Sequence, residues 1–156
     1  MSASDKEPAP VEAEGEDLRT VAVGKTDVGR ERDVNEDAMF VDPEGKLFLV
    51  CDGMGGHSSG QLASRMAVHA VINTVQSPAA QEAEPDELVI ALEEANRAVF
   101  AHAQEDPSCR GMGTTAVGLR IDGKRGHICH VGDSRLYRLR GSNFQLLTRD
   151  HSLSNL

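Results

Sequence analysis

A run of four short strand-like segments in the C-terminal third most constrains how this chain can fold. The segments are residues 114–121, 125–131, 135–139 and 144–147. Short turn sequences such as Asp122-Gly123 and Gly132-Asp133 separate them, because glycine and aspartate favour turns. Two helical segments precede the run. This order of elements predicts an α+β layered fold whose sheets are mostly antiparallel.

The first two thirds of the chain supply the other predicted elements. Alternating or continuously apolar segments predict three strands, at residues 20–28, 37–41 and 46–51. Apolar residues at helical spacing predict two helices, over residues 60–75 and 86–103. Residues 47–51 of the third segment are apolar without interruption, which is typical of a strand buried on both faces.

The N-terminal residues 1–17 differ in composition from the rest. They contain six acids and one base, so they carry −5 of the formal net charge of −9. Val11 is their only sizeable apolar residue after the initiator methionine. Such a segment buries too little surface to offset its ordering entropy. We therefore predict a disordered acidic tail at 1–17 and a domain over 18–156.

Composition excludes several classes of protein. No apolar run is longer than that of Leu47 to Cys51, which is far shorter than the roughly 20 residues that a membrane-spanning helix requires, and the acidic N-terminus lacks a signal-peptide core. A sequence pI near 5.1 disfavours nucleic acid as a partner. The three cysteines are irregularly spaced and do not suggest a disulfide framework. We expect a cytoplasmic protein that binds neither membranes nor nucleic acids.

Three short stretches contain the candidate functional residues. They are Arg32 to Asp37, Asp52 to His57, and Val131 to Arg135. Each places an acid at a predicted turn beside a strand, where a rigid scaffold presents functional groups. Taken singly, each is also consistent with an ordinary turn or a solvated ion cluster.

The glycine-rich middle stretch does not fit the nucleotide-binding motifs. Gln61 and Leu62 stand where a P-loop needs lysine and a hydroxyl residue, and Ser58 stands where the dinucleotide fingerprint needs glycine or alanine. A carboxylate followed by bare backbone fits a hard cation with oxygen ligands instead. A zinc site at His127 and His130 is not expected, because residues three apart on a strand face opposite ways.

Taken together and in this order, the stretches resemble the metal-dependent protein phosphatases, the type 2C serine/threonine family, and specifically its bacterial branch. The resemblance is carried by the following motifs: Arg32-x-x-Asn-Glu-Asp-Ala38, Leu49 to His57, Gly113-Thr-Thr115 and Val131 to Tyr137. It extends from about residue 20 to the end of the sequence. It implies a sandwich of two antiparallel sheets flanked by helices.

The resemblance also implies a site and a reaction. Two Mn²⁺ or Mg²⁺ ions would share Asp52, the carbonyl of Gly53 would bind one of them, and Asp133 would help to bind a possible third. Glu36 and Asp37 would orient metal-bound waters, and Arg32 would clamp the substrate phosphate. Water activated by the two ions would hydrolyse phosphoserine or phosphothreonine in proteins that are substrates of a serine/threonine kinase.

Two departures from the family pattern bear on activity. Met54 follows Asp52-Gly53, where many eukaryotic relatives carry a histidine that acts as general acid. The sequence also corresponds to only the first half to two-thirds of the family domain, so we expect a domain that is incomplete at its C-terminal side. The alternative to the enzyme is a catalytically inactive truncated fragment that binds phosphoproteins or a partner chain.

Overall fold

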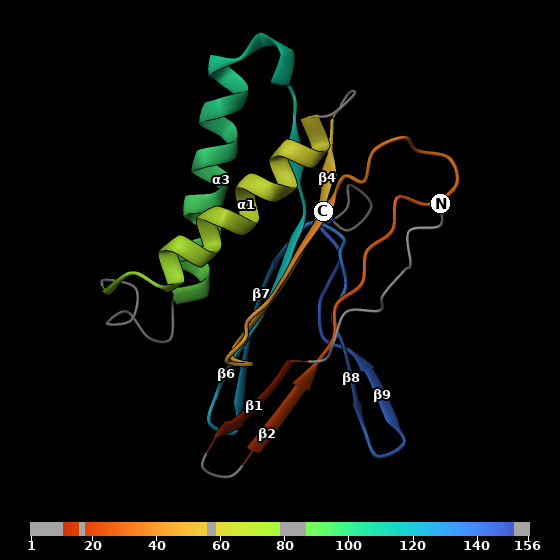
Figure 1. Ribbon diagram of the computed structural model, residues 1–156, viewed down its shortest axis with the longest axis vertical. Helices are drawn as coiled ribbons and strands as arrows, with labels where there is room; N and C mark the ends of the chain where they lie inside the picture. Colours follow the sequence, from red (N-terminus) through yellow and green to blue (C-terminus); the bar gives the residue numbers. More distant parts are fainter. Residues whose placement is uncertain (1–10, 16–17, 56–58, 79–86, 152–156) are drawn as a thin grey trace, which may run out of the picture.

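The computed structural model describes residues 11–15, 18–55, 59–78 and 87–151. Its central element is an antiparallel sheet of five strands (Figure 1). The strands run in the order β3-β4-β6-β7, and the short β5 pairs with the end of β4. Their bounds are β3 Asp37–Val41, β4 Leu47–Met54, β5 Gly113–Thr114, β6 Ala116–Asp122 and β7 Arg125–Val131.

Two helices cover one face of this sheet (Figure 1). They are α1, Ser59–Val75, and α3, Glu87–Glu105, which is followed by the short 3-10 helix η1, Pro107–Cys109. Alternate residues of β4 are buried, among them Leu49 and Cys51. They form one apolar core with the inner sides of both helices, for example Val71 of α1. Because side chains alternate along a strand, the other residues of β4 lie on the face without helices.

Two hairpins complete the described structure. Strands β8, Tyr137–Arg140, and β9, Asn143–Leu146, form one, and strands β1, Val11–Gly15, and β2, Leu18–Ala22, form the other. Both lie near the lower end of the central sheet in Figure 1, where β6 turns into β7. The expected α+β class with antiparallel sheets and flanking helices is confirmed. None of the helices in the described ranges is long and apolar enough to cross a membrane.

The N-terminal segment differs from its prediction. Residues 11–15 form a strand rather than a disordered tail, because β2 supplies backbone hydrogen-bonding partners that a composition argument does not consider. The strand predicted over 20–28 ends at Ala22. Residues 1–10 and 16–17 of the predicted tail lie outside the described residues, as do residues 152–156 of the predicted domain.

Removing residues 1–17 should change the free energy of unfolding by less than about 0.5 kcal/mol. The hairpin strands contact chiefly each other, and an isolated two-stranded hairpin is marginally stable. Denaturant unfolding of the intact and shortened chains measures the difference. As a control, deletion of residues 1–28 should cost more, because Thr26 accepts a hydrogen bond from Asn35 and Gly24 packs on Met39. Equal losses from both deletions would contradict the prediction.

Candidate metal centre

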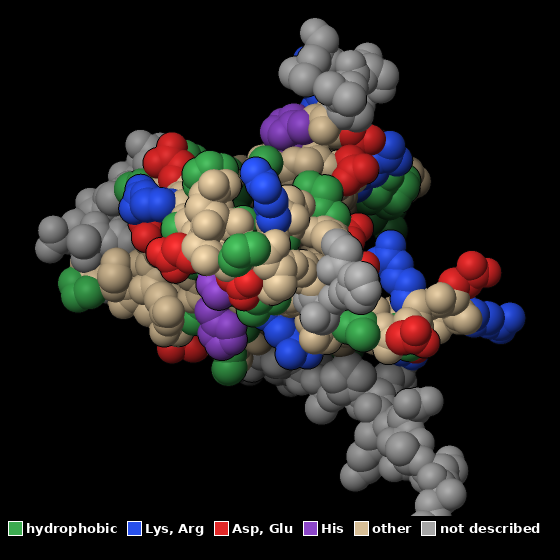
Figure 2. Space-filling model, turned by 90° about the horizontal axis from the view of Figure 1, so that it is seen from above, with side chains coloured by type: hydrophobic (Ala, Val, Ile, Leu, Met, Phe, Trp, Pro, Cys, Tyr) green, Lys and Arg blue, Asp and Glu red, His purple; other side chains and the backbone are tan. Residues whose placement is uncertain are grey.

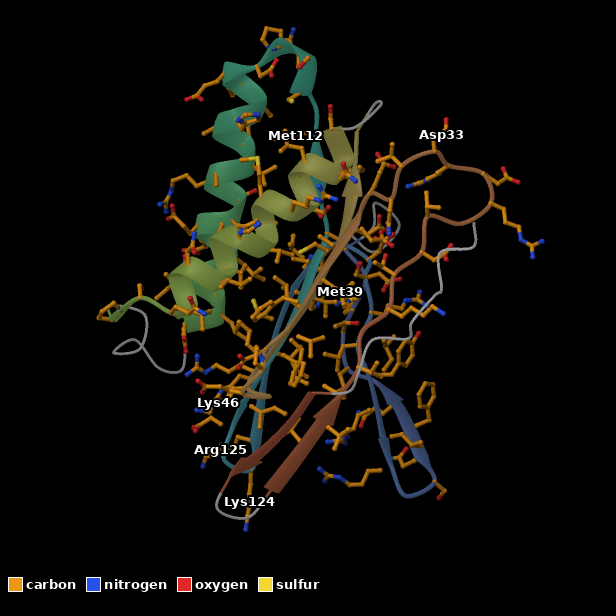
Figure 3. The ribbon with its side chains drawn as sticks, in the orientation of Figure 1. Asp33, Met39, Lys46, Met112, Lys124 and Arg125 are labelled. Atoms are coloured by element: carbon orange, nitrogen blue, oxygen red, sulfur yellow. The ribbon has the colours of Figure 1, made fainter. Side chains whose placement is uncertain are left out.

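The register of β3 and β4 brings two of the predicted carboxylates together. Asp37 is the direct partner of Asp52 across this antiparallel pair. Directly opposed residues share a face of the sheet, and the pattern of β4 puts Asp52 on the face without helices. Both residues are exposed. Met39 lies two residues along β3 on the same face (Figure 3). Its sulfur is so close to Gly24 that a Cβ added there would lie 2.7 Å from it. The two acids therefore lie at the open end of a face that the helices leave free.

The electrostatics of Asp52 show an excess of negative charge at this place. The pKa of its carboxyl is raised, first by partial loss of hydration and then by the charge of Asp37. Arg32 lowers that pKa, while a hydrogen bond with Asp37 and the charge of Asp133 raise it. Clustered carboxylates that destabilise one another's ionised forms are stabilised by a divalent cation. The donor set consists of oxygens, which Mg²⁺ and Mn²⁺ prefer. These residues fit the metal ions that the sequence predicts.

Asp133 reaches the site on the loop after β7. Gly132, with φ of 94°, begins the loop in a conformation that favours glycine, and a Cβ there would lie 2.7 Å from Cγ2 of Thr115. The hydroxyls of Thr115 and Ser134 are 2.6 Å apart. Thr115 Oγ1 also accepts a hydrogen bond from the backbone N–H of Asp52, at 3.0 Å. A chain of hydrogen bonds thus ties the Asp133 loop to β4.

Arg32 and Glu36 form an ion pair on the loop before β3. The guanidinium Nη1 of Arg32 is 2.6 Å from Oε2 of Glu36. The Arg32 side chain is 61% exposed and that of Glu36 only 12%, so the arginine end of the pair faces solvent. An exposed guanidinium can exchange its carboxylate partner for an incoming phosphate at little cost.

Two glycines allow the backbones of β4 and α1 to approach closely. A Cβ on Gly53 would overlap the carbonyl oxygen of Gly60 and lie 2.6 Å from that of Glu36. The backbone N–H of Gly53 donates to the same Glu36 carbonyl, at 3.1 Å. A Cβ on Gly60 would in turn overlap the carboxylate of Glu36. This contact holds Glu36 against the first turn of α1, where the helix dipole favours negative charge.

The structure thus pairs Asp37 with Asp52 across the sheet. It places Asp133 and Arg32 close enough to affect the pKa of the Asp52 carboxyl. Gly53 follows Asp52 in β4, and its backbone N–H donates to the carbonyl of Glu36. Asp52 and Gly53 stand inside β4 rather than in the turn that the sequence predicted, because β5 pairs with Gly53 and Met54 and extends the strand. Gly56 and His57 of the same motif lie outside the described residues.

Thr115 and Ser134 were missed as positioning residues by the sequence analysis. Thr115 lies within the motif Gly113-Thr-Thr115 and Ser134 within Gly132-Asp-Ser134, but these motifs did not assign a role to either hydroxyl. The contact joins residues 19 apart in the chain, and local spacing does not reveal it.

The family model of protein phosphatase 2C matches residues 27–155, which include all of these site residues. The chain belongs to the protein phosphatase 2C family. Among curated relatives, the serine/threonine phosphatase stp of Listeria welshimeri is 36% identical over 135 residues, which are 83% of this chain and 54% of that protein. Protein phosphatase PhpP of Streptococcus pneumoniae is 36% identical over 134 residues, with the same coverage.

Solved structures agree with this membership. The serine/threonine phosphatase PstP/Ppp of Mycobacterium tuberculosis superposes with a TM-score of 0.73 at 31% identity, over 83% of this chain and 54% of that one. A structure of the PstP catalytic domain in complex with two manganese ions superposes with a TM-score of 0.74 at 31% identity, over 83% and 55%. The chain spans about half the length of the relatives that it matches.

Proposed function

We propose that this chain provides the metal-binding half of a phosphatase that hydrolyses phosphoserine and phosphothreonine in proteins. The observation that carries the proposal is the pairing of Asp37 with Asp52 on the open face of the sheet. Asp133 and the exposed Arg32 both lie close enough to affect the pKa of the Asp52 carboxyl. Membership of the family and the two manganese ions in the PstP structure support it.

In this proposal each residue has one role. Asp52, the carbonyl of Gly53 and Asp133 bind divalent ions, either Mn²⁺ or Mg²⁺, and Asp133 serves a third, weaker ion. Glu36 and Asp37 orient the hydration of the ions, and the hydrogen bonds from Asp52 through Thr115 to Ser134 hold the carboxylates in place. Bound ions of this kind supply Lewis acidity, which activates water and stabilises the phosphoryl oxygens.

Arg32 is the substrate-binding residue of the proposal. Its planar guanidinium suits bidentate hydrogen bonding to a phosphate, for which it would leave Glu36. Met54, 62% exposed beside the site, has no transferable proton, so no side chain at that position protonates the leaving group. The substrates would be phosphoproteins made by a serine/threonine kinase.

We further propose a cytoplasmic location. All three cysteines are free, as expected in a reducing compartment. Lys and Arg side chains are interspersed with Asp and Glu on the described part of the face that Figure 2 shows, rather than gathered into one basic patch that would suit a nucleic acid.

The test is release of phosphate from a phosphothreonine peptide by the protein expressed from its complete reading frame. We expect turnover with Mn²⁺ and loss of turnover after chelation with EDTA, restored by added Mn²⁺. Peptide binding without turnover in the presence of Mn²⁺ would instead support the inactive binding module. Turnover that persists in EDTA would contradict the metal mechanism.

Arg32→Ala should raise KM for the same peptide about 10- to 100-fold, because charge-assisted hydrogen bonds to the phosphate are lost. The affinity for Mn²⁺, measured by calorimetry, should change by less than about twofold, since Arg32 donates no lone pair. Arg30→Ala is the matched control, because Arg30 is exposed on the same loop. A large loss of Mn²⁺ affinity in Arg32→Ala would contradict the substrate role.

A further inference from the structure

Three metal-ligating side chains of different chemistry converge where α3 ends. His102 is in the last turn of α3, Asp106 follows the helix, and Cys109 belongs to η1. One ligand atom from each lies within 4.8 Å of the others. Within the described ranges, no other group of three His, Cys, Asp or Glu side chains is gathered this tightly. None of the three takes part in the proposed phosphatase site.

Backbone and capping bonds fix this arrangement. The N–H of Asp106 donates to the carbonyl of His102 at 3.0 Å, and the N–H of Cys109 donates to that of Asp106 at 2.9 Å. Asp106 caps η1, because its Oδ1 accepts hydrogen bonds from Ser108 N at 2.8 Å and Ser108 Oγ at 2.7 Å. Both bonds from Ser108 go to Oδ1, so the cap does not use Oδ2. The three donors are therefore held together before any ion binds.

The donor set selects for a particular kind of ion. Imidazole nitrogen, thiolate sulfur and carboxylate oxygen together are typical of Zn²⁺, whereas Mg²⁺ and Mn²⁺ prefer sites made of oxygen. Cys109 is only 6% exposed, so its sulfur faces the protein interior and its neighbours rather than solvent.

We propose that His102, Asp106 and Cys109 bind one Zn²⁺ ion, with water as the fourth ligand. This site is separate in residues and in metal preference from the carboxylate centre. It binds through a buried sulfur that the phosphatase proposal does not use.

The position of the site indicates what the ion would stabilise. The carbonyl of Ser108 accepts a hydrogen bond from Ser59 Oγ, at the first residue of α1, at 3.3 Å. The N–H of Met112 donates to the carbonyl of Cys109 at 3.0 Å, and Met112 leads directly into β5 (Figure 3). β5 ends at Thr114, whose hydroxyl donates to the Asp52 carbonyl at 3.0 Å. A bound zinc ion would thus stabilise the segment after α3, which contacts the first residue of α1 and leads into β5 next to Asp52.

Cobalt provides a direct test, because tetrahedral Co²⁺ replaces Zn²⁺ and reports a thiolate ligand by a charge-transfer band. The EDTA-treated protein is titrated with Co²⁺ in excess Mg²⁺, which occupies the oxygen sites. We expect one equivalent of Co²⁺ with a charge-transfer band and tetrahedral d–d bands, both removed by one equivalent of Zn²⁺. Cys109→Ser should lose the charge-transfer band, and Cys129→Ser, a half-buried cysteine outside the cluster, should keep it.

Two further variants keep the test decisive if Cys109→Ser does not fold. His102→Ala should weaken Co²⁺ binding at least about tenfold, while His69→Ala, an exposed histidine of α1, should not. Asp106→Asn preserves the cap, since asparagine caps as well as aspartate, yet should weaken binding by removing the charge. Absence of the charge-transfer band in the unchanged protein would overturn the proposal, as would Co²⁺ affinities unaffected in both His102→Ala and Asp106→Asn.

Discussion

Asp52→Asn should lower kcat for hydrolysis of a phosphothreonine peptide at least about 100-fold, because Asp52 supplies the carboxylate that would hold the metal ions in the proposed mechanism. Asparagine has the same shape but no charge, so it removes the negative charge and one of the two ligating oxygens without creating a cavity. The side chain is exposed and its backbone bonds with Thr115 do not depend on the carboxylate. The thermal midpoint of the variant without metal should therefore stay close to that of the unchanged protein.

The matched control is Asp33→Asn. Asp33 lies on the loop that carries Arg32, and its exposed side chain points away from the sheet in Figure 3. Activity and Mn²⁺ affinity should be unchanged in this variant. Mn²⁺ binding should weaken in Asp52→Asn alongside the loss of turnover. If Asp52→Asn kept more than about a tenth of the parent kcat, the bridging role would be wrong.

Gly53→Ala should destabilise the protein by at least about 3 kcal/mol, the upper part of the usual range for overpacking. The added methyl group would meet backbone atoms of Gly60 and Glu36, which cannot rotate away as a side chain could. Relief requires β4 and α1 to separate, and with them the core that they share. Urea unfolding followed by circular dichroism measures the loss.

Gly118→Ala is the control for this prediction. Gly118 is also a buried strand glycine, in β6, but the nearest atom to its added Cβ would be Leu49 Cδ1 at an ordinary 3.6 Å. Its effect on stability should be within about 0.5 kcal/mol. Gly60→Ala should cost less than Gly53→Ala, because the nearest atoms to its added Cβ belong to the carboxylate of Glu36, which can rotate away. Equal stability of Gly53→Ala and Gly118→Ala would show that the two backbones are not held in contact.

Several elements could be predicted because their signals are local. β3 and β7 have the bounds that their sequences predicted, and α3 begins and ends within two residues of its prediction. Alternation and helical spacing reflect which side of an element is buried, and each is visible within ten to twenty residues. The segment predicted as one strand over 114–121 forms two strands, β5 and β6, with Thr115 between them. The hydroxyl of Thr115 hydrogen-bonds with the backbone N–H of Asp52 and the hydroxyl of Ser134.

The sequence by itself determined the class of fold, the order of the main elements and membership of the phosphatase family. Strand and helix periodicity and the motifs around Asp37, Asp52 and Asp133 are all local features of the sequence. Only the tertiary structure decided the contact of Gly53 with Gly60, the hydroxyl pair of Thr115 and Ser134, the pairing of β1 with β2, and the cluster of His102, Asp106 and Cys109. The physical reason is the same in most of these cases. Apolar periodicity indicates which side of an element is buried, but the partner of a polar side chain or of a bare backbone depends on strand register, helix docking and the path of the turns, which that periodicity does not specify.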